Sequence, residues 1–342
     1  MTITALSSKA WPKTRVMAQK SVSAIRPAFY ICVVSVAVIA SYAYWIRTHT
    51  IFACQADGYS ADRYVAYCNG ENYGEYEHGA FAFDLEPSAE KFAARADVLV
   101  LGSSRIQVAL STTPTADWFS AALARYYLLG FAYNENIVFA EQILPKIIPR
   151  AKVYVINVDD FFEQFETTPV RTIFHEPGAL KQYETKRFWQ RVHEPICKVL
   201  AVLCGNKFVI FRSRETGAYR ENGWAGPKGA LVSYDDSVDL DVVDRYVVAA
   251  RDFLSRFTRG KCVILTMVPY AGTKIGNANA VATALGMKLV TPPILEGLRT
   301  DDGSHLDQPS AKRWSEAFFQ AAGPKIRSCL EGQQASPPLA NP

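Results

Sequence analysis

Five apolar runs recur between residues 97 and 290, and helical patterns separate most of them. The runs read DVLVL, RYYLLGF, KVYVINV, KCVILTMV and MKLV. Because apolar residues follow one another in these runs instead of alternating with polar ones, they predict strands buried on both faces, as in a parallel sheet. We therefore predict a three-layer α/β domain over residues 95–330, in which a parallel five-stranded sheet lies between two layers of helices.

Three segments between and after these runs have helical spacing. NENIVFAEQILPKII repeats apolar residues at intervals of three and four, and Asn134 is its expected N-cap. DLDVVDRYVVAARDFLSRF has the same spacing, and QPSAKRWSEAFFQAAGPKI predicts the last helix of the domain.

Other parts of the chain depart from this alternation. Residues 161–238 are rich in aromatic residues, Arg and Gly, and predict a long, partly helical insertion that acts as a lid or a substrate-binding region. Residues 47–94 are polar and rich in Tyr, and predict a connector ahead of the domain. Residues 331–342 have the composition of a disordered tail.

Residues 28–46 contain no charged side chain and are about long enough to cross a bilayer as a helix. Residues 1–27 form a basic tail, which places that end in the cytoplasm. Tyr42, Tyr44 and Trp45 fit an interfacial aromatic belt. The alternative is a cleaved signal peptide, with Ser41 and Ala43 before the cut. We favour the anchor, which predicts a single-pass protein of the bacterial inner membrane with its main domain in the periplasm.

The net charge of +4 comes from the N-terminal tail. Residues 1–27 hold five basic residues and no acidic one, which leaves 32 basic against 33 acidic residues in the remainder. The main domain has no basic excess, which argues against nucleic acid as a partner.

The cysteines agree with export to an oxidising compartment. Cys32 lies in the apolar segment and six cysteines lie outside it. Their proximity in the sequence suggests the pairs Cys54–Cys68 and Cys197–Cys204, which leaves Cys262–Cys329. Buried free thiols are the alternative. The Cys and His spacings do not fit a zinc site, so we expect no metal.

The connector contains Glu71, Glu75, Glu77 and His78 within eight residues. Such a cluster of titratable side chains is either a functional site or a solvated loop, and the second reading is the more common.

The first strand of the domain ends at Gly102, Ser103, Ser104 and Arg105. A glycine there lets the backbone turn sharply and approach a ligand. A serine on that turn can present its hydroxyl, with backbone N–H groups nearby to hold an oxyanion. The same residues also make a good helix N-cap or anion-binding turn.

A second segment, before the last helix, supplies the partners that a nucleophilic serine needs. Asp302 and His305 are three residues apart, so the carboxylate can reach and orient the imidazole, which can act as the base for a serine. The alternative is that His305 caps the helix and Asp302 closes a turn. The two segments together are more specific than either alone.

These two segments resemble the SGNH/GDSL hydrolase superfamily over roughly residues 95–325. The resemblance implies a flavodoxin-like fold, with Ser104 as nucleophile, Asp302 as orienting acid and His305 as base. Ser103 takes the place of the Asp of that family.

Two other motifs of that family are poorly matched. Gly130 stands where an oxyanion-binding glycine is expected, but Tyr133 stands near the place of a second one. Asp159 occupies the position of an oxyanion-binding Asn, and an ionised Asp cannot donate a hydrogen bond. Asn134 or Asn157 is the expected substitute.

Arg105 adds a cation beside the nucleophile, either for an anionic substrate group or for pairing with a carboxylate such as Asp159. The Gly-Ser-Ser-Arg variant on an anchored, exported chain is similar to proteins that acylate or deacylate envelope polysaccharides. We therefore expect a serine esterase or O-acyltransferase acting on acyl esters of an envelope glycan. It would need no cofactor and could work with other envelope-glycan modification proteins.

Two further readings stay open. A non-catalytic envelope protein of the same fold could bind a glycan or an assembly partner, and Asp159 favours this reading. A phosphate-ester or anion-binding protein could use the Gly102 turn and Arg105, although phosphoryl chemistry usually needs metal-binding carboxylates.

Overall fold

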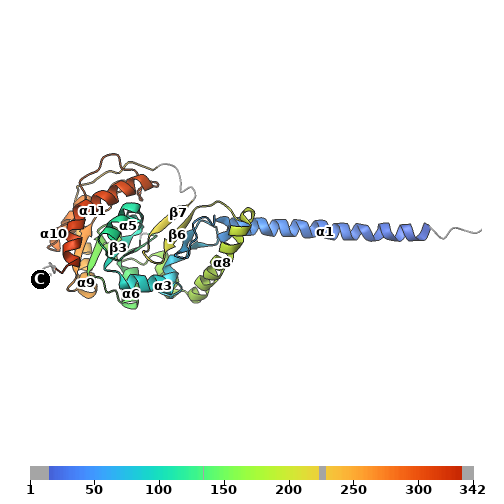
Figure 1. The fold of residues 1–342 in the computed structure, drawn as a ribbon, viewed down its shortest axis with the longest axis horizontal. Helices are drawn as coiled ribbons and strands as arrows, with labels where there is room; N and C mark the ends of the chain where they lie inside the picture. The colour runs from blue at the N-terminus through green and yellow to red at the C-terminus, as the bar shows by residue number, and fades with distance from the viewer. Residues whose placement is uncertain (1–14, 134, 223–228, 333–342) are drawn as a thin grey trace, which may run out of the picture.

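A computed structural model describes residues 15–133, 135–222 and 229–332. The first helix, α1 (Arg15–His49), projects from a domain that holds all the other elements (Figure 1). Its segment Pro27–His49 has a mean hydropathy of 1.9 and is long and apolar enough to cross a membrane. The predicted N-terminal apolar helix is therefore confirmed, and it continues three residues beyond the predicted segment.

A parallel sheet forms the centre of the domain. Its strands are β3 (Val98–Ser103), β4 (Tyr126–Phe131), β5 (Val153–Asn157) and β8 (Cys262–Thr266), in the order β4-β3-β5-β8. When the four strands are numbered by their order in the chain, their order across the sheet is 2-1-3-4. This is the order of flavodoxin-like sheets, whose ligands bind at the carboxyl end where the connections diverge, between the first and third strands. Here that point lies between β3 and β5.

The sheet has four strands and not the predicted five. The run MKLV makes only an isolated parallel bridge, between Leu289 and Leu265. Val290 donates to the carbonyl of Leu265, but Pro292 and Pro293 follow and lack the N–H that a longer ladder needs. The apolar run therefore ends before a strand can form.

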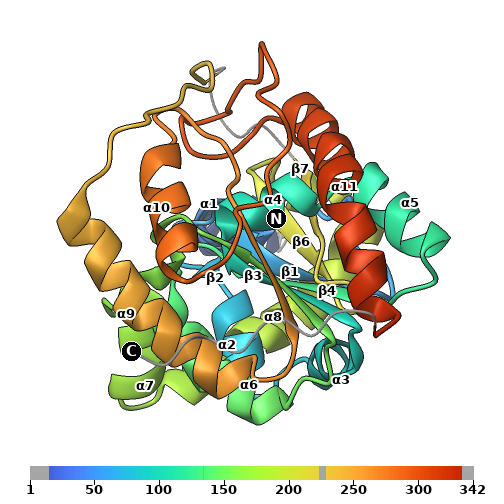
Figure 2. The same ribbon diagram turned by 90° about the vertical axis from the view of Figure 1, so that its left-hand side faces the viewer.

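Helices cover both faces of the parallel sheet (Figure 2). Successive residues such as Val100 and Leu101 belong to opposite cores, because side chains alternate along a strand. One face packs against α4 (Ser104–Leu110), α5 (Thr113–Ala121) and α11 (Gln308–Leu330). The other packs against α3 (Pro87–Arg95), α6 (Ile137–Ile147), α9 (Leu240–Phe257) and α10 (Ile275–Ala284). The three predicted helices are thus present, although α6 is capped by Asn136, and Asn134 lies outside the described residues.

The connector and the insertion together form a second sheet. β1 (Arg63–Cys68) and β2 (Gly74–Glu75) come from the connector, and β6 (Val209–Ser213) and β7 (Tyr219–Asn222) come from the insertion. The sheet is antiparallel, in the order β2-β1-β6-β7. The connector and the insertion also contain the helices α2 (Glu77–Ala82), α7 (Thr168–His175) and α8 (Ala179–Val199), of which α8 is the longest. Three 3-10 turns are η1 (Ile51–Ala53), η2 (Asp160–Phe162) and η3 (Ala201–Leu203).

The three predicted disulfides are confirmed. Cys54–Cys68 and Cys197–Cys204 lie in the second-sheet region, and Cys262–Cys329 joins β8 to α11. Cys32 is free and exposed on α1.

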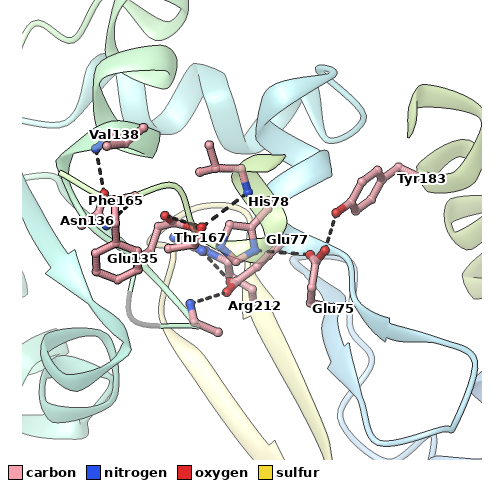
Figure 3. Close-up of polar contacts among 12 residues, drawn as sticks. Glu75, Glu77, His78, Glu135, Asn136, Val138, Phe165, Thr167, Tyr183 and Arg212 are labelled. Atoms are coloured by element: carbon pink, nitrogen blue, oxygen red, sulfur yellow. Dashed lines mark hydrogen bonds and ion pairs between the residues drawn. The ribbon is translucent and has the colours of Figure 1, made fainter. Parts of the chain in front are cut away.

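Buried charged side chains link the second sheet to the end of β4 (Figure 3). The fully buried His78 lies between two carboxylates, 2.9 Å from Glu135 and 3.3 Å from Glu75. Arg212 on β6 pairs with Glu77 at 2.6 Å, and Glu77 also accepts a hydrogen bond from the N–H of Ala132, directly after β4.

The solvated-loop reading of this cluster is therefore wrong for Glu75, Glu77 and His78, which are buried. Buried charges are tolerated only where opposite charges and hydrogen bonds satisfy them, and each of these side chains has such a partner. The solvated reading holds for Glu71, which is exposed and pairs with His49 at the end of α1.

Candidate active site

The turn between β3 and α4 presents Ser104 at the carboxyl end of the central strand. Gly102 has φ of +152°, and a Cβ there would lie 2.7 Å from a methyl of Ile106 and 3.0 Å from Cβ of Asn157, so only glycine fits. Ser103 is the N-cap of α4, since its hydroxyl accepts from the N–H of Arg105 at 3.3 Å. Ser104 is then the first helical residue. The two serines have separate tasks, because one holds the turn and the other faces the site.

The loop before α11 brings Asp302 and His305 to the same place. One oxygen of Asp302 accepts the backbone N–H groups of Ser304 and His305, both at 2.8 Å. Asp302 thus closes a turn, which was one half of the alternative to a catalytic role. The cap of α11 is Asp307, not His305, so the imidazole is free of that role.

The three side chains form one hydrogen-bonded chain. Nε2 of His305 lies 2.7 Å from Oγ of Ser104, and Nδ1 lies 2.7 Å from Oδ2 of Asp302. Residues 201 positions apart in the chain thus meet in the order serine, imidazole, carboxylate. This is the arrangement in which an imidazole can remove a hydroxyl proton while a carboxylate fixes its orientation.

The electrostatics of Asp302 suit that role. Partial burial acts to raise the pKa of Asp302, but the hydrogen bond and charge of His305 and the backbone N–H groups outweigh it and hold the pKa well below its usual value. Asp302 therefore remains ionised and can stabilise an imidazolium beside it.

Arg105 is engaged within the protein. Its guanidinium lies 3.3 Å from Asp159 and 3.0 Å from Asp160, donates to the hydroxyl of Ser304 at 3.0 Å, and stacks 4.1 Å from the ring centre of Tyr270. Of the two alternatives for Arg105, the pairing with Asp159 is therefore the one present. Through Ser304, Arg105 also joins α4 to the loop of His305.

Asp159 is buried at the end of β5 and is not a solvated side chain. Its carboxylate accepts from the hydroxyl of Ser103 at 2.9 Å and from the N–H of Phe161 at 3.1 Å. Burial raises the pKa of Asp159, and Arg105 opposes that shift. The side chain holds the turn in place and presents no donor for an oxyanion.

The structure does not assemble the expected oxyanion donors. The N–H of Gly130 donates to Oε1 of Gln107 at 3.0 Å and is therefore occupied. Tyr133, which stands near the place of the second expected glycine, has φ of +61°, a conformation that glycine adopts more easily. Asn134 lies outside the described residues.

Asn157 keeps an unused donor. Its Oδ1 accepts from the N–H of Val268 at 2.8 Å, while its Nδ2 is buried without a hydrogen-bond partner among the described residues. The side chain is fully buried beside Gly102, so a substrate oxygen does not reach it in this conformation. The N–H of Ser104, in the first turn of α4, remains as a donor position, because the first N–H groups of a helix have no intrahelical acceptor.

A cavity of about 260 Å³ lies next to the partners of Arg105, and its wall includes Tyr246, Lys274 and Asn277. Ser104, Asp302 and His305 are not among the residues that line it. Arg105 contacts three further wall residues: Asp159, Asp160 and Tyr270. Sequence reasoning missed Gln107, Ser304 and Tyr270. Of these three residues, only Ser304 could have been suspected from the sequence, because it stands next to His305.

His193, Cys197 and Cys204 lie close enough together to share a metal ion. The two sulfurs form a disulfide, and both nitrogens of His193 are within hydrogen-bond distance of Tyr59 and the carbonyl of Cys54. The possible ligand atoms of these three residues are therefore already bonded within the protein, and we assign no metal site to them.

The chain matches no protein-family model, no curated protein sequence and no solved structure. The resemblance to SGNH/GDSL hydrolases therefore rests on the residues of the site.

Proposed function

We propose that this protein is a membrane-anchored serine esterase or O-acyltransferase of the SGNH type. The observation that carries the proposal is the chain of two 2.7 Å contacts from Ser104 through His305 to Asp302. A serine hydroxyl is a weak nucleophile at neutral pH and becomes reactive when a positioned base takes its proton.

In the proposed reaction, Oγ of Ser104 attacks the carbonyl carbon of an ester and its proton passes to Nε2 of His305. Asp302 stabilises the imidazolium. The tetrahedral intermediate collapses, the proton moves from His305 to the leaving alcohol, and an acyl-serine remains. Water or a sugar hydroxyl then attacks the acyl-serine with His305 as base, which releases an acid or a new ester and restores Ser104.

The N–H of Ser104 would stabilise the oxyanion, together with a second donor that Asn157 could supply after a local shift. The geometry of α4 favours Ser104 for this role, and the occupied N–H of Gly130 argues against Gly130.

An acylated envelope glycan is the proposed substrate, with the domain on the periplasmic side of the inner membrane. The apolar helix α1 and the three disulfides support an exported, anchored protein. The cavity beside Arg105 supports a hydroxylated ligand, because carboxylate, amide, ammonium and phenol groups line it and can all hydrogen-bond to sugar hydroxyls. The insertion would select the acceptor.

One observation favours a second function, that of a non-catalytic envelope protein which binds a glycan or an assembly partner. The N–H of Gly130 is bonded to Gln107, and Asp159 brings a carboxylate instead of an amide to the end of β5. A protein without an oxyanion hole would keep the fold and bind without turnover.

A serine-directed fluorophosphonate probe separates the two functions. The full chain in detergent is treated with the probe, and the label is located by peptide mass spectrometry. We expect labelling at Ser104 that is lost in Ser104→Ala and in His305→Ala. Ser103→Ala separates the two hydroxyls: Ser103 contacts Asp159 and not His305, so the variant should keep its label at Ser104, at a reduced rate because α4 loses its cap. A folded protein that stays unlabelled would refute the enzyme and favour the binding protein.

A further inference from the structure

The end of α8 exposes an unusual number of large apolar side chains. We define the α8 tip as residues 188–203. The side chains that it exposes are Phe188, Trp189, Val199, Leu200, Val202 and Leu203, of which Val199 is 80% and Val202 71% exposed. Apolar side chains gathered in this way mark a surface that meets another apolar phase.

Hydrogen bonds place the segment directly after the α8 tip beside the end of α1. The N–H of Gly205 donates to the carbonyl of Phe52 at 2.7 Å, and the N–H of Lys207 donates to the carbonyl of Ala53 at 3.0 Å. The ammonium of Lys207 reaches the carbonyl of Thr48, inside the last turn of α1, at 3.3 Å. Figure 1 shows the end of α8 next to the point where α1 leaves the domain.

The length of α1 indicates where the membrane surface lies. The apolar segment has 23 residues. At about 1.5 Å per residue it spans about 34 Å, slightly more than the hydrocarbon core of about 30 Å. If α1 crosses the membrane, His49 lies at the boundary with water, and so do the segments bonded to residues 48–53. The α8 tip then lies at the same boundary.

Local contacts fix the shape of this surface. The disulfide Cys197–Cys204 closes the turn between α8 and the segment that leads to β6. Trp189 packs edge-on against Phe52 of η1, directly after α1. These two contacts hold the α8 tip against the segment that follows α1.

We propose that the α8 tip inserts into the interfacial layer of the membrane that α1 crosses, so that the domain rests on the lipid surface. An apolar face with basic neighbours is the chemistry of interfacial membrane segments. Arg47 and Lys198 are exposed near this face and can reach lipid phosphates, although Lys198 also pairs with Glu194 at 2.7 Å. The proposal rests on the proposed membrane anchoring and is independent of the chemistry of Ser104.

Photo-crosslinking tests this contact in the full chain. The photoreactive residue p-benzoyl-phenylalanine is introduced in separate variants in place of Val202, Val36 and Ile294, and each protein is reconstituted into phosphatidylethanolamine–phosphatidylglycerol vesicles. Val36 lies in α1 and reports on the anchor. Ile294 is 70% exposed, so it matches Val202 in exposure but lies in another part of the domain. Lipid adducts are counted by mass spectrometry after irradiation.

We expect adducts at positions 36 and 202, and at least about tenfold fewer at 294, because an interfacial segment reaches only about 5–10 Å into the headgroup boundary and the rest of the domain stays in water. Adducts at 36 without adducts at 202 would overturn the proposed contact and leave the anchor intact. Equal yields at 202 and 294 would also overturn it. No adducts at 36 would overturn both the anchor and the contact, whatever the reactivity of Ser104.

Discussion

At the residue scale, two adjacent serines show how one turn supplies both structure and chemistry. The hydroxyl of Ser103 donates to the buried carboxylate of Asp159, and that of Ser104 points to His305. The choice between them from the sequence depended on a resemblance, since both follow the glycine. The structure separates them because Ser103 ends β3 with extended backbone, whereas Ser104 begins α4 and faces the loop before α11.

Asp302→Asn should leave the fold intact and disable the site. An amide N–H directed at Nδ1 of His305 would favour the tautomer with its proton on Nε2, which cannot accept the proton of Ser104. We expect the rate of fluorophosphonate labelling at Ser104 to fall by at least about 10³-fold. Asp301→Asn is the matched control, because it removes a neighbouring carboxylate whose charge acts on His305 but which does not orient the imidazole by a hydrogen bond in the described structure. It should change this rate by less than about tenfold. Equal effects of the two variants would contradict the role of Asp302.

Arg105→Gln should destabilise the protein, because it leaves the buried Asp159 without its cation. We expect the free energy of unfolding to fall by about 3 kcal/mol. Arg125→Gln is the control, since its ion pair with Asp97 is exposed and should contribute less than about 1 kcal/mol. Urea unfolding monitored by circular dichroism measures both. If Arg105→Gln unfolds like the wild type, the ion pair with Asp159 does not stabilise the fold.

At the scale of elements, the sequence predicted those helices, strands and disulfides that depend on residues close together in the chain. The buried strands and the helices α6, α9 and α11 follow from periodicity, and the disulfide pairs follow from proximity and elimination. The predicted fifth strand does not form, because Pro292 and Pro293 follow the apolar run. The connector was predicted as a simple link, because a strand of six residues such as β1 becomes recognisable only beside β6, whose sequence lies more than a hundred residues further on.

The disulfide Cys262–Cys329 should stabilise the protein more than Cys197–Cys204. The first closes a loop of 67 residues and the second a loop of 7. Since a longer loop loses more entropy in the unfolded chain when it is closed, we expect losses of about 4 and about 2 kcal/mol when each pair is replaced by alanines. Urea unfolding of the two double variants measures the difference. A larger loss for the Cys197–Cys204 pair would mean that native contacts, and not loop length, decide the contribution.

At the scale of the whole molecule, the second sheet is tied to the parallel sheet by buried charge. Glu77 and Glu135 each bond across this junction, to Arg212 and to His78. The sequence showed the cluster but not its burial, because neither Arg212 nor Glu135 is near His78 in the chain. The candidate site was easier to predict, since each of its two segments carries its own local motif.

The junction should give the protein a pH dependence that the substitution His78→Gln removes. Burial acts to lower the pKa of His78, but its hydrogen bonds to Glu135 and Glu75 outweigh that effect and raise the pKa to about 10. The unfolded imidazole titrates near about 6.5, so between these two values the folded state holds one more proton than the unfolded state. Its contribution to stability is complete below about pH 6.5 and falls by about 1.4 kcal/mol per pH unit up to about pH 10.

Wild type should therefore be more stable than His78→Gln by about 3 kcal/mol at pH 6.5, because the variant leaves two buried carboxylates without a cation. This difference should shrink as the pH rises toward 9, since His78 then loses its advantage over the unfolded state. His175→Gln is the control, because His175 is largely exposed and pairs with Glu166 at the surface, so its difference from wild type should stay small and nearly constant. Urea unfolding at half-unit steps of pH measures both. A difference for His78→Gln that stays constant from pH 6.5 to 9 would show that the imidazole is neutral in the folded protein, and that the junction is held by Arg212 and Glu77 instead.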